Sequence, residues 1–255
     1  MAGVAAVNPV REMGGALLLG ARAMSAARRV PPRVFFREVR YQLDRVAARS
    51  ALLVISAMAF FGAVLITIAN AQARRLTGNL VVLGPGYFEL LLREFGPVTS
   101  SLLVAARYGS SSAAEISSMS VTEQLDALRM CAGDPAADVV APRVVAGAIG
   151  IPILCILGTA SASLSAALTA LYAFGVDGFA FVDPRFIDAP DFLSAGAKVL
   201  LCGLYIPLVV AFRALPARGG SAAVGVATTQ AVVAACLGCL VIDVLVGLAF
   251  RALGM

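Results

Sequence analysis

Long apolar runs alternate with short charged segments along the chain. Five such runs can be delimited, at about residues 50–73, 84–106, 144–176, 192–212 and 224–250. A helix needs about 20 mostly apolar residues to cross the hydrocarbon core of a bilayer. The pattern therefore predicts an all-α integral membrane protein with five transmembrane helices.

A basic amphipathic segment leads into the first run. Within residues 35–49, apolar side chains recur at helical spacing, and arginines occupy positions between them. Such a segment is typical of a helix that lies in the membrane interface. We therefore expect an N-terminal interfacial amphipathic helix there. A cytoplasmic or interfacial arm at 1–34 would precede it, and residues 35–255 would form one membrane domain.

The composition agrees with a membrane location. Hydrophobic residues make up 60% of the chain and charged residues 14%, whereas a soluble domain is about half apolar and about a quarter charged. A net charge of +5 could suggest nucleic-acid binding, but the arginines flank the apolar runs, as they do in membrane proteins. We expect no nucleic acid among the partners.

The distribution of arginine predicts the orientation. The N-terminal arm, the segment 107–143 and the loop 213–218 are basic, whereas the loop 177–191 is acidic. Cytoplasmic loops carry the excess of Lys and Arg, so we expect a cytoplasmic N-terminus, retained rather than cleaved as a signal peptide, and a C-terminus on the other side. The pair Arg74-Arg75 falls on the outer side and opposes this assignment.

Several kinds of chemistry lack the residues that they need. The chain has no histidine, which removes the usual zinc sites and the Ser-His-Asp triad, and it has no G-x-x-x-x-G-K-[ST] motif. A membrane enzyme that uses Glu94 and Lys198 as acid and base is the weaker alternative. We expect no catalytic residues, no metal and no cofactor, so any ATP hydrolysis must come from another chain.

A polar segment at 107–143 interrupts the apolar pattern. Within it, Ser120 and Glu123 have the spacing of a capping box at a helix start. The pair Asp134-Pro135 is expected to end this helix. The segment thus predicts a short amphipathic helix at about 119–130 on the cytoplasmic side, of the kind with which many transporters dock onto an ATPase.

The residues in and around the polar segment resemble the signature of the MlaE permease family of lipid ABC transporters. That signature runs R-E-L-G-P, L-x-x-A-G-R-x-G-S-x-x-A-E-x-G-x-M, T-E-Q-x-D-A-L, D-P and P-R. The matching positions are Arg93, Glu94, Gly96, Pro97, Ala106, Arg107, Gly109, Ser110, Ala114, Glu115, Met119, Thr122, Glu123, Gln124, Asp126, Ala127, Leu128, Asp134, Pro135, Pro142 and Arg143. A weaker similarity covers about residues 35–253, so residues 35–255 resemble an MlaE-like permease domain.

The resemblance implies a permease subunit that moves phospholipid or a related lipid between bacterial membranes. It implies a homodimer in the inner membrane, with a periplasmic C-terminus, and three further components: an MlaF-like ATPase, an MCE-domain protein similar to MlaD and a STAS-domain protein similar to MlaB. The short helix would be the coupling helix that docks onto the ATPase. Its coupling residues would be Glu115, Met119, Thr122, Glu123, Gln124, Leu125, Asp126 and Leu128.

Besides Ala106, where the family commonly has Gly, and Val199, where it has Ser, three positions depart from the family pattern. Ile68 stands where the family has Gln, and Val226 and Gln230 stand where it tends to have Arg. These departures indicate a divergent paralogue. They favour, as an alternative function, a membrane scaffold for an MCE-domain protein with a degenerate transport path.

Charged residues inside the apolar runs are the remaining candidates. An ionisable group at the bilayer centre costs about 2.5–3.5 kcal/mol or more, so it should face a cavity or the bundle interior. One interpretation is that Arg93, Glu94 and Lys198 line the lipid path. The other is that these residues pair with one another or with Asp243 and hold helices together, which we favour for Asp243. Gly96-Pro97 is expected to break or kink its helix.

Overall fold

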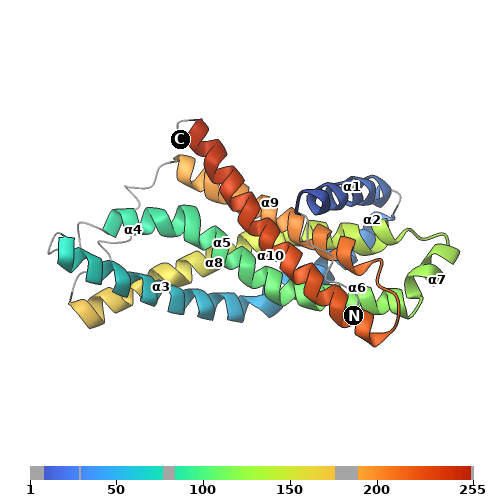
Figure 1. The fold of residues 1–255 in the computed structure, drawn as a ribbon, viewed down its shortest axis with the longest axis horizontal. Helices are drawn as coiled ribbons and strands as arrows, with labels where there is room; N and C mark the ends of the chain where they lie inside the picture. Colours follow the sequence, from blue (N-terminus) through green and yellow to red (C-terminus); the bar gives the residue numbers. More distant parts are fainter. Residues whose placement is uncertain (1–8, 29, 77–83, 176–188, 254–255) are drawn as a thin grey trace.

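The computed structural model describes residues 9–28, 30–76, 84–175 and 189–253, and the regular structure of these residues is helical (Figure 1). Four helical stretches are long and apolar enough to cross a membrane: Pro32–Ala73, Ala136–Phe174, Ala189–Ala214 and Ser221–Ala252. They correspond to the first, third, fourth and fifth predicted runs. The second run is not among them because it carries Glu89, Arg93 and Glu94.

The first long stretch joins the predicted interfacial helix to the first predicted span. Helix α2 (Pro32–Leu43), the π-helical turn η1 (Asp44–Ala48) and α3 (Arg49–Leu76) follow one another without a break. Val39, Gln42 and Val46 are buried, whereas Phe36 and Tyr41 are exposed. The helix over 35–49 thus has one packed face, and its position at a membrane surface stays a prediction.

The second predicted run is also part of a continuous helical stretch. It comprises α4 (Gly84–Leu90), η3 (Leu91–Phe95), α5 (Gly96–Val104), η4 (Ala105–Gly109) and α6 (Ser110–Val121). The helix does not break at Gly96-Pro97, and a kink there stays a prediction. A π-helical turn directly before Pro97 widens the helix and accommodates the proline, so the stretch continues.

The capping box predicted for the polar segment is not formed. Ser120 lies in the last turn of α6, and its hydroxyl donates to the carbonyl oxygen of Leu215 at 2.9 Å. Glu123 is the N-cap of α7 (Gln124–Met130) in a left-handed conformation, with φ of 59° and no side-chain capping hydrogen bond. The short helix is therefore present, but a left-handed residue sets its start.

The pair Asp134-Pro135 starts the next helix rather than ending α7. Helix α7 ends at Met130, where Ala132 adopts φ of 60° and Gly133 N–H donates to the Leu128 carbonyl. The Asp134 carboxylate accepts from the Ala136 N–H at 3.0 Å. This cap begins η5 (Ala136–Val140) and α8 (Ala141–Phe174).

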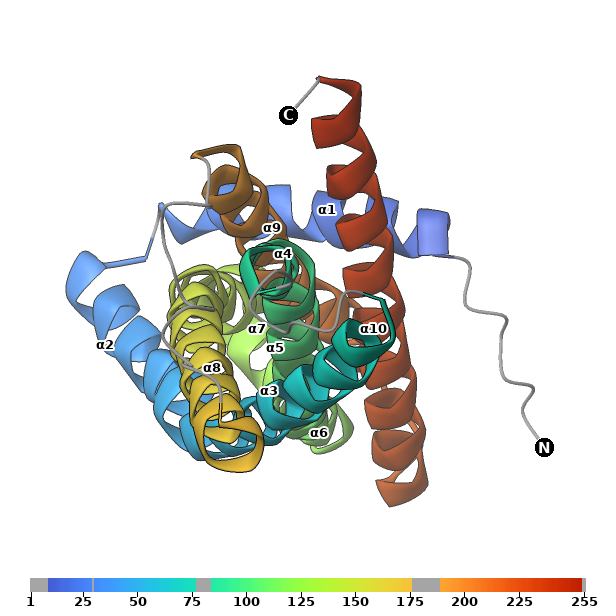
Figure 2. The same cartoon turned by 90° about the vertical axis from the view of Figure 1, so that its left-hand side faces the viewer.

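The remaining helices are α1 (Pro9–Ala27), α9 (Ala189–Ala214) and α10 (Ser221–Ala252). Helix α8 ends at Phe174, and its C-cap Gly175 has a left-handed φ of 65°. In Figure 1, α3, α8 and α10 run toward one end of the molecule, and the stretch from α4 to α6 and α9 run back. Figure 2 shows α1 lying across the bundle. Sequence reading had assigned this helix only to an N-terminal arm.

Small residues allow the main helices to approach closely. A Cβ atom on Gly62 of α3 would lie 2.2 Å from the carbonyl oxygen of Ala162 of α8. A Cβ atom on Gly147 of α8 would lie 2.5 Å from the carbonyl oxygen of Gly203 of α9. Such contacts between backbones are typical of helices that pack inside membranes.

Candidate functional site

A buried lysine connects three helical stretches in the apolar part of the bundle. Lys198 of α9 is 1% exposed. Its Nζ lies 2.5 Å from Oε2 of Glu94 in η3 and 3.0 Å from Oδ1 of Asp243 in α10. It also donates to the carbonyl oxygen of Arg93 at 3.2 Å. The contacts with Glu94 and with the Arg93 carbonyl are hydrogen bonds, and the contact with Asp243 is an ion pair.

The guanidinium of Arg93 extends the charged cluster to the start of α9. Its Nη1 lies 2.9 Å from Oδ1 of Asp191, a carboxylate that is 7% exposed, and its Nε lies 3.9 Å from Oε1 of Glu94. Three carboxylates therefore face two cations. Sequence reading missed Asp191 because it was counted in an acidic loop. The available signal was its spacing of seven residues from Lys198, which places both on one face of a helix.

The structure brings together the three residues predicted for the substrate path and the one predicted to be structural. Arg93, Glu94, Lys198 and Asp243 all belong to one cluster. The ion pairs among them are the ones that the structural interpretation expects. The same cluster also borders an open hollow, as the substrate-path interpretation expects.

This hollow lies between α4–η3 and the C-terminal part of α10 and has a volume of about 670 Å³. Its lining mixes charged and apolar side chains: Gly86, Glu89, Leu90, Arg93, Glu94, Asp243, Val244, Gly247, Leu248 and Arg251. We call it the charged hollow. A surface of this kind can accept an amphiphile, because it offers both ionic and hydrocarbon contacts.

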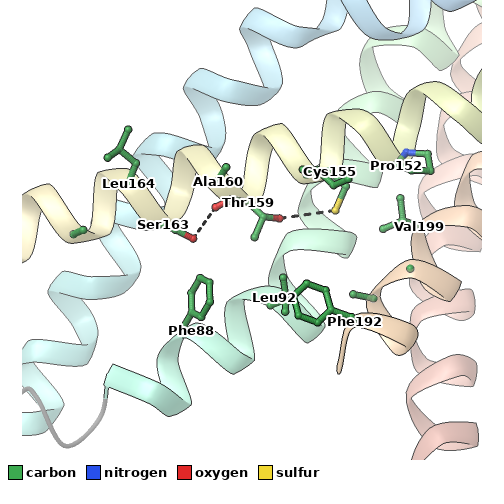
Figure 3. A pocket seen from close by; sticks show the side chains of 14 residues that line it. Phe88, Leu92, Pro152, Cys155, Thr159, Ala160, Ser163, Leu164, Phe192 and Val199 are labelled. Carbon is green, nitrogen blue, oxygen red and sulfur yellow. Dashed lines mark hydrogen bonds between the residues drawn. The ribbon is translucent and has the colours of Figure 1, made fainter. Parts of the chain in front are cut away.

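A second cavity, of about 600 Å³, lies between α4–η3, α8 and α9 and is almost wholly apolar. Figure 3 shows the rings of Phe88 and Phe192 and the side chain of Leu92 pointing toward α8. The hydroxyls on its α8 wall have partners within that helix: Ser163 donates to the carbonyl of Thr159 at 2.8 Å. The cavity therefore presents a hydrocarbon-like surface.

The same short piece of helix forms a wall of both cavities. Phe88 and Leu92 line the apolar cavity, whereas Glu89, Arg93 and Glu94 line the charged hollow. The π-helical turn in η3 lies within this wall, and such turns occur frequently at functional sites.

The predicted coupling residues divide into exposed and packed positions. Thr122, Glu123 and Gln124 are exposed at the tip between α6 and α7 (Figure 1). Leu125 is 4% exposed, and Leu128 and Met119 pack against the core. Asp126 pairs with Arg129 at 2.6 Å and Arg218 at 3.4 Å.

Glu115 lies in a different environment from the other predicted coupling residues. Its carboxylate forms ion pairs with Arg45 of η1 and, at 3.0 Å, with Arg143 of α8, which is 3% exposed. Partial burial raises the pKa of Glu115, but the charges and hydrogen bonds of Arg143 and Arg45 outweigh burial and hold its pKa below the ordinary value. This geometry fixes α2–η1 against α6 and α8.

Two of the divergent positions lie on the outside of the helices, and the third has a polar contact. Ile68 is 53% exposed and Val226 is 58% exposed. Gln230 accepts a hydrogen bond from Arg213 at 3.4 Å. An arginine at 230 would instead bring a second positive charge to Arg213.

The long apolar helices define a multi-pass membrane protein. Its ion pairs lie among these helices and beside an open hollow, and charges inside a membrane mark substrate pathways in transport proteins. The sequence profile of the family described as Permease MlaE matches residues 39–249, and the chain belongs to this family.

Curated relatives agree with this membership. A probable ABC transporter permease protein of Rickettsia typhi is 32% identical over 80% of this chain and 79% of its own length. The intermembrane phospholipid transport system permease protein MlaE of Haemophilus influenzae is 33% identical, over 79% of this chain and 78% of that protein. The chloroplastic protein TRIGALACTOSYLDIACYLGLYCEROL 1 of Arabidopsis thaliana is 30% identical, over 83% of this chain and 61% of that protein.

Proposed function

We propose that this chain is the non-catalytic permease subunit of an ABC transporter that moves phospholipid or a related lipid between bacterial membranes. A separate MlaF-like ATPase drives it, and an MCE-domain protein and an MlaB-like STAS protein complete the assembly. The observation that carries the proposal is the pairing of the charged hollow with the apolar cavity across the wall formed by α4–η3. A phospholipid has a charged headgroup and hydrocarbon chains, and this wall offers a surface for each.

We further infer five membrane passes, with the stretch from α4 to α5 as the second. In support, the course of the helices reverses at each connection (Figure 1). The ion pairs of Arg93 with Asp191 and of Glu94 with Lys198 offset the charge in that pass. The basic connections and α7 lie together at one end. By the positive-inside rule this end is cytoplasmic, with the C-terminus in the periplasm of an inner-membrane protein.

The outer face of α10 supports a homodimer. Exposed apolar side chains recur along it at helical spacing, at Val226, Val233, Leu237, Leu240, Val244 and Leu248. A second copy packed along this face would place two charged hollows near one another. The lipid path would then lie between the subunits.

Docking of the ATPase on α7 is tested by charge reversal at its exposed tip. Glu123→Lys should abolish co-purification of a co-expressed MlaF-like ATPase, weakening binding by about 30-fold or more if the position is a hot spot. Arg40→Glu, at an exposed position of α2, is the matched control. Equal retention of the ATPase by both variants would reject α7 as the docking element.

The lipid path is tested by filling the charged hollow without breaking its ion pairs. Val244→Trp should lower ATP-dependent lipid transfer by the reconstituted complex about tenfold, whereas Leu157→Trp, on an exposed face of α8, should not. Unchanged transfer by Val244→Trp would exclude this path.

The alternative is a membrane scaffold for an MCE-domain protein with a degenerate path, and the loss of basic side chains at Val226 and Gln230 favours it. A scaffold predicts no ATP-dependent lipid transfer by the wild-type complex. Transfer that is present and is abolished by Lys198→Ala would exclude it.

A further inference from the structure

Glu115 and Arg143 close the base of the segment that contains α7. Glu115 lies in α6, the helix before α7, and Arg143 lies in the first turn of α8, which follows η5. Nη2 of Arg143 lies 3.0 Å from Oε2 of Glu115, and its Nη1 donates to the carbonyl oxygen of Val139 in η5 at 2.7 Å. Arg143 is 3% exposed, so solvent ions screen this pair little. The helical stretches on both sides of α7 are therefore tied to each other at its base.

Arg45 brings a third helical stretch to the same carboxylate. It belongs to η1, between α2 and α3, and its Nη1 donates to Oε2 of Glu115. The side chain of Arg45 is 14% exposed, and its guanidinium lies over the ring of Tyr41, 5.8 Å from the ring centroid. Because one carboxylate oxygen contacts both arginines, a displacement of α6 acts on α3 and on α8 together. We call Arg45, Glu115 and Arg143 the Glu115 triad.

A π-helical turn lies beside the triad in each of the three stretches. Arg45 is within η1, η4 ends directly before α6, and η5 holds the Val139 carbonyl that Arg143 contacts. Tyr108 of η4 is 1% exposed, and the charges of all three triad residues act on it. Sharp bends in helices occur at such turns, which are frequent at functional sites. The triad therefore holds three helical stretches at points where they can bend.

The two stretches that the triad joins to α6 continue to the apolar cavity. Helices α3 and α8 pack closely, since a Cβ atom on Gly158 of α8 would lie 3.1 Å from the side chains of Val54 and Met58 of α3. Residues of α8 between Pro152 and Ala167 line the cavity. Close-packed interiors have low compressibility and transmit displacements. A shift at the triad thus reaches a wall of the cavity.

We propose that Arg45 and Arg143 are positioning residues for lipid transport, which carry the ATP-driven movement of α7 through Glu115 to α3 and α8. This inference rests on the proposed function, in which α7 docks the ATPase. Neither arginine lines the charged hollow or the apolar cavity, so both act at a distance from a lipid bound there. Coupling between distant sites travels through ion pairs and rigid elements that have two arrangements. Without Arg45, α7 would still bind the ATPase, but its movement would reach α3 only weakly.

The quantity that tests this role is the amount of lipid transferred for each ATP hydrolysed. It is measured in proteoliposomes that contain the complete complex, with fluorescently labelled phosphatidylethanolamine as the lipid. Arg45→Gln should lower this ratio about tenfold, within the roughly 5–150-fold range typical of coupling between sites. Co-purification of the ATPase and the rate of ATP hydrolysis should change less than about twofold. Because Glu115 keeps Arg143, this variant retains the ion pair at the base of α7.

Arg49→Gln is the matched control on the same helical stretch. Arg49 lies one turn after Arg45, and its pair with Asp44 has both side chains more than half exposed. Its loss should change the ratio less than about twofold, because exposed ion pairs contribute little. Arg45→Lys keeps a positive charge beside Glu115 and should restore the ratio to within about threefold of the wild-type value, since lysine lacks only the fork of donors.

Three results would overturn the inference. One is an unchanged ratio in Arg45→Gln, and another is an equal fall in Arg49→Gln. The third is a parallel fall in lipid transfer and ATP hydrolysis, which would show that Arg45 only holds the fold. A wild-type complex that hydrolyses ATP but transfers no lipid would reject the proposed function and this inference with it. Wild-type transfer with an unchanged ratio in Arg45→Gln rejects this inference alone.

Discussion

Lys198 donates a hydrogen bond to the backbone carbonyl oxygen of Arg93, and Pro97 lies four residues after that carbonyl. Proline has no N–H, so the usual helical donor to this oxygen is missing. The same ammonium group pairs with Glu94 and Asp243. One side chain thus compensates for a proline in η3–α5 and ties that stretch to α10.

Removing this ammonium should destabilise the protein. Lys198→Met would remove the hydrogen-bond donor of Glu94 and of a backbone carbonyl, and the ionic partner of Asp243. Breaking a buried ion pair costs about 3–5 kcal/mol. The lower end is expected, because Glu94 is 38% exposed. Unfolding in detergent micelles measures the loss. Adding Glu94→Gln and Asp243→Asn should restore part of the stability, and a loss below about 1 kcal/mol from Lys198→Met would contradict this account.

The role assigned to Pro97 predicts coupling between two positions. Pro97→Ala supplies an N–H for the carbonyl of Arg93, so the bond from Lys198 becomes partly redundant. The cost of Lys198→Met should therefore fall by about 0.5–1.5 kcal/mol in the Pro97→Ala background. A double-mutant cycle on the free energy of unfolding measures this coupling. Additive effects would show that Lys198 does not compensate for the proline.

The sequence predicted the long helices well because their signal is local. A run of apolar residues without charges specifies a membrane helix regardless of its neighbours, as Ala189–Ala214 and Ser221–Ala252 illustrate. The charged run from Gly84 was also assigned as a helix, and the structure has a continuous helical stretch there. What the sequence could not specify was which charges meet.

The errors arose where tertiary contacts override local preferences. Ser120 and Glu123 have the spacing of a capping box, but the Leu215 carbonyl takes the Ser120 hydroxyl and α6 continues past it. Asp134 was read as the end of one helix, although its carboxylate caps the next. Glu115 was grouped with the coupling residues by motif, and this role stays a prediction. The fold adds that its carboxylate lies between Arg45 and Arg143, which no local pattern specifies.

That position of Glu115 predicts a structural cost. Glu115→Gln would leave Arg143, which is 3% exposed, without its carboxylate, and should cost about 3 kcal/mol in unfolding free energy. Arg49→Gln is the control, because its pair with Asp44 has both side chains more than half exposed, and it should cost less than about 1 kcal/mol. Equal effects of the two substitutions would contradict the buried arrangement.

The same ion cluster predicts a pH dependence. The folded protein holds the pKa of Glu115 below the ordinary value of 4.5, so its contribution is fully present at neutral pH. It should be lost as the pH falls from 4.5 through the lowered pKa, because protonation then removes the partner of Arg143. Across this range, the difference in stability between wild type and Glu115→Gln should shrink. A difference in stability that increases as the pH falls would contradict a lowered pKa of Glu115.

The contact between α3 and α8 depends on the absence of a side chain at Gly62. A Cβ atom there would lie 2.2 Å from the carbonyl oxygen of Ala162, which is backbone and cannot rotate away. Gly62→Ala should force the helices apart and destabilise the protein by about 1–3 kcal/mol or more.

Gly225→Ala in α10 is the matched control, since no atom lies within 4 Å of its Cβ position. That substitution should stabilise the helix by up to about 1 kcal/mol, because alanine has the higher helix propensity. Thermal unfolding of both variants in the same detergent separates the two effects, and a Gly62→Ala protein as stable as the Gly225→Ala protein would show that α3 and α8 do not meet at this glycine.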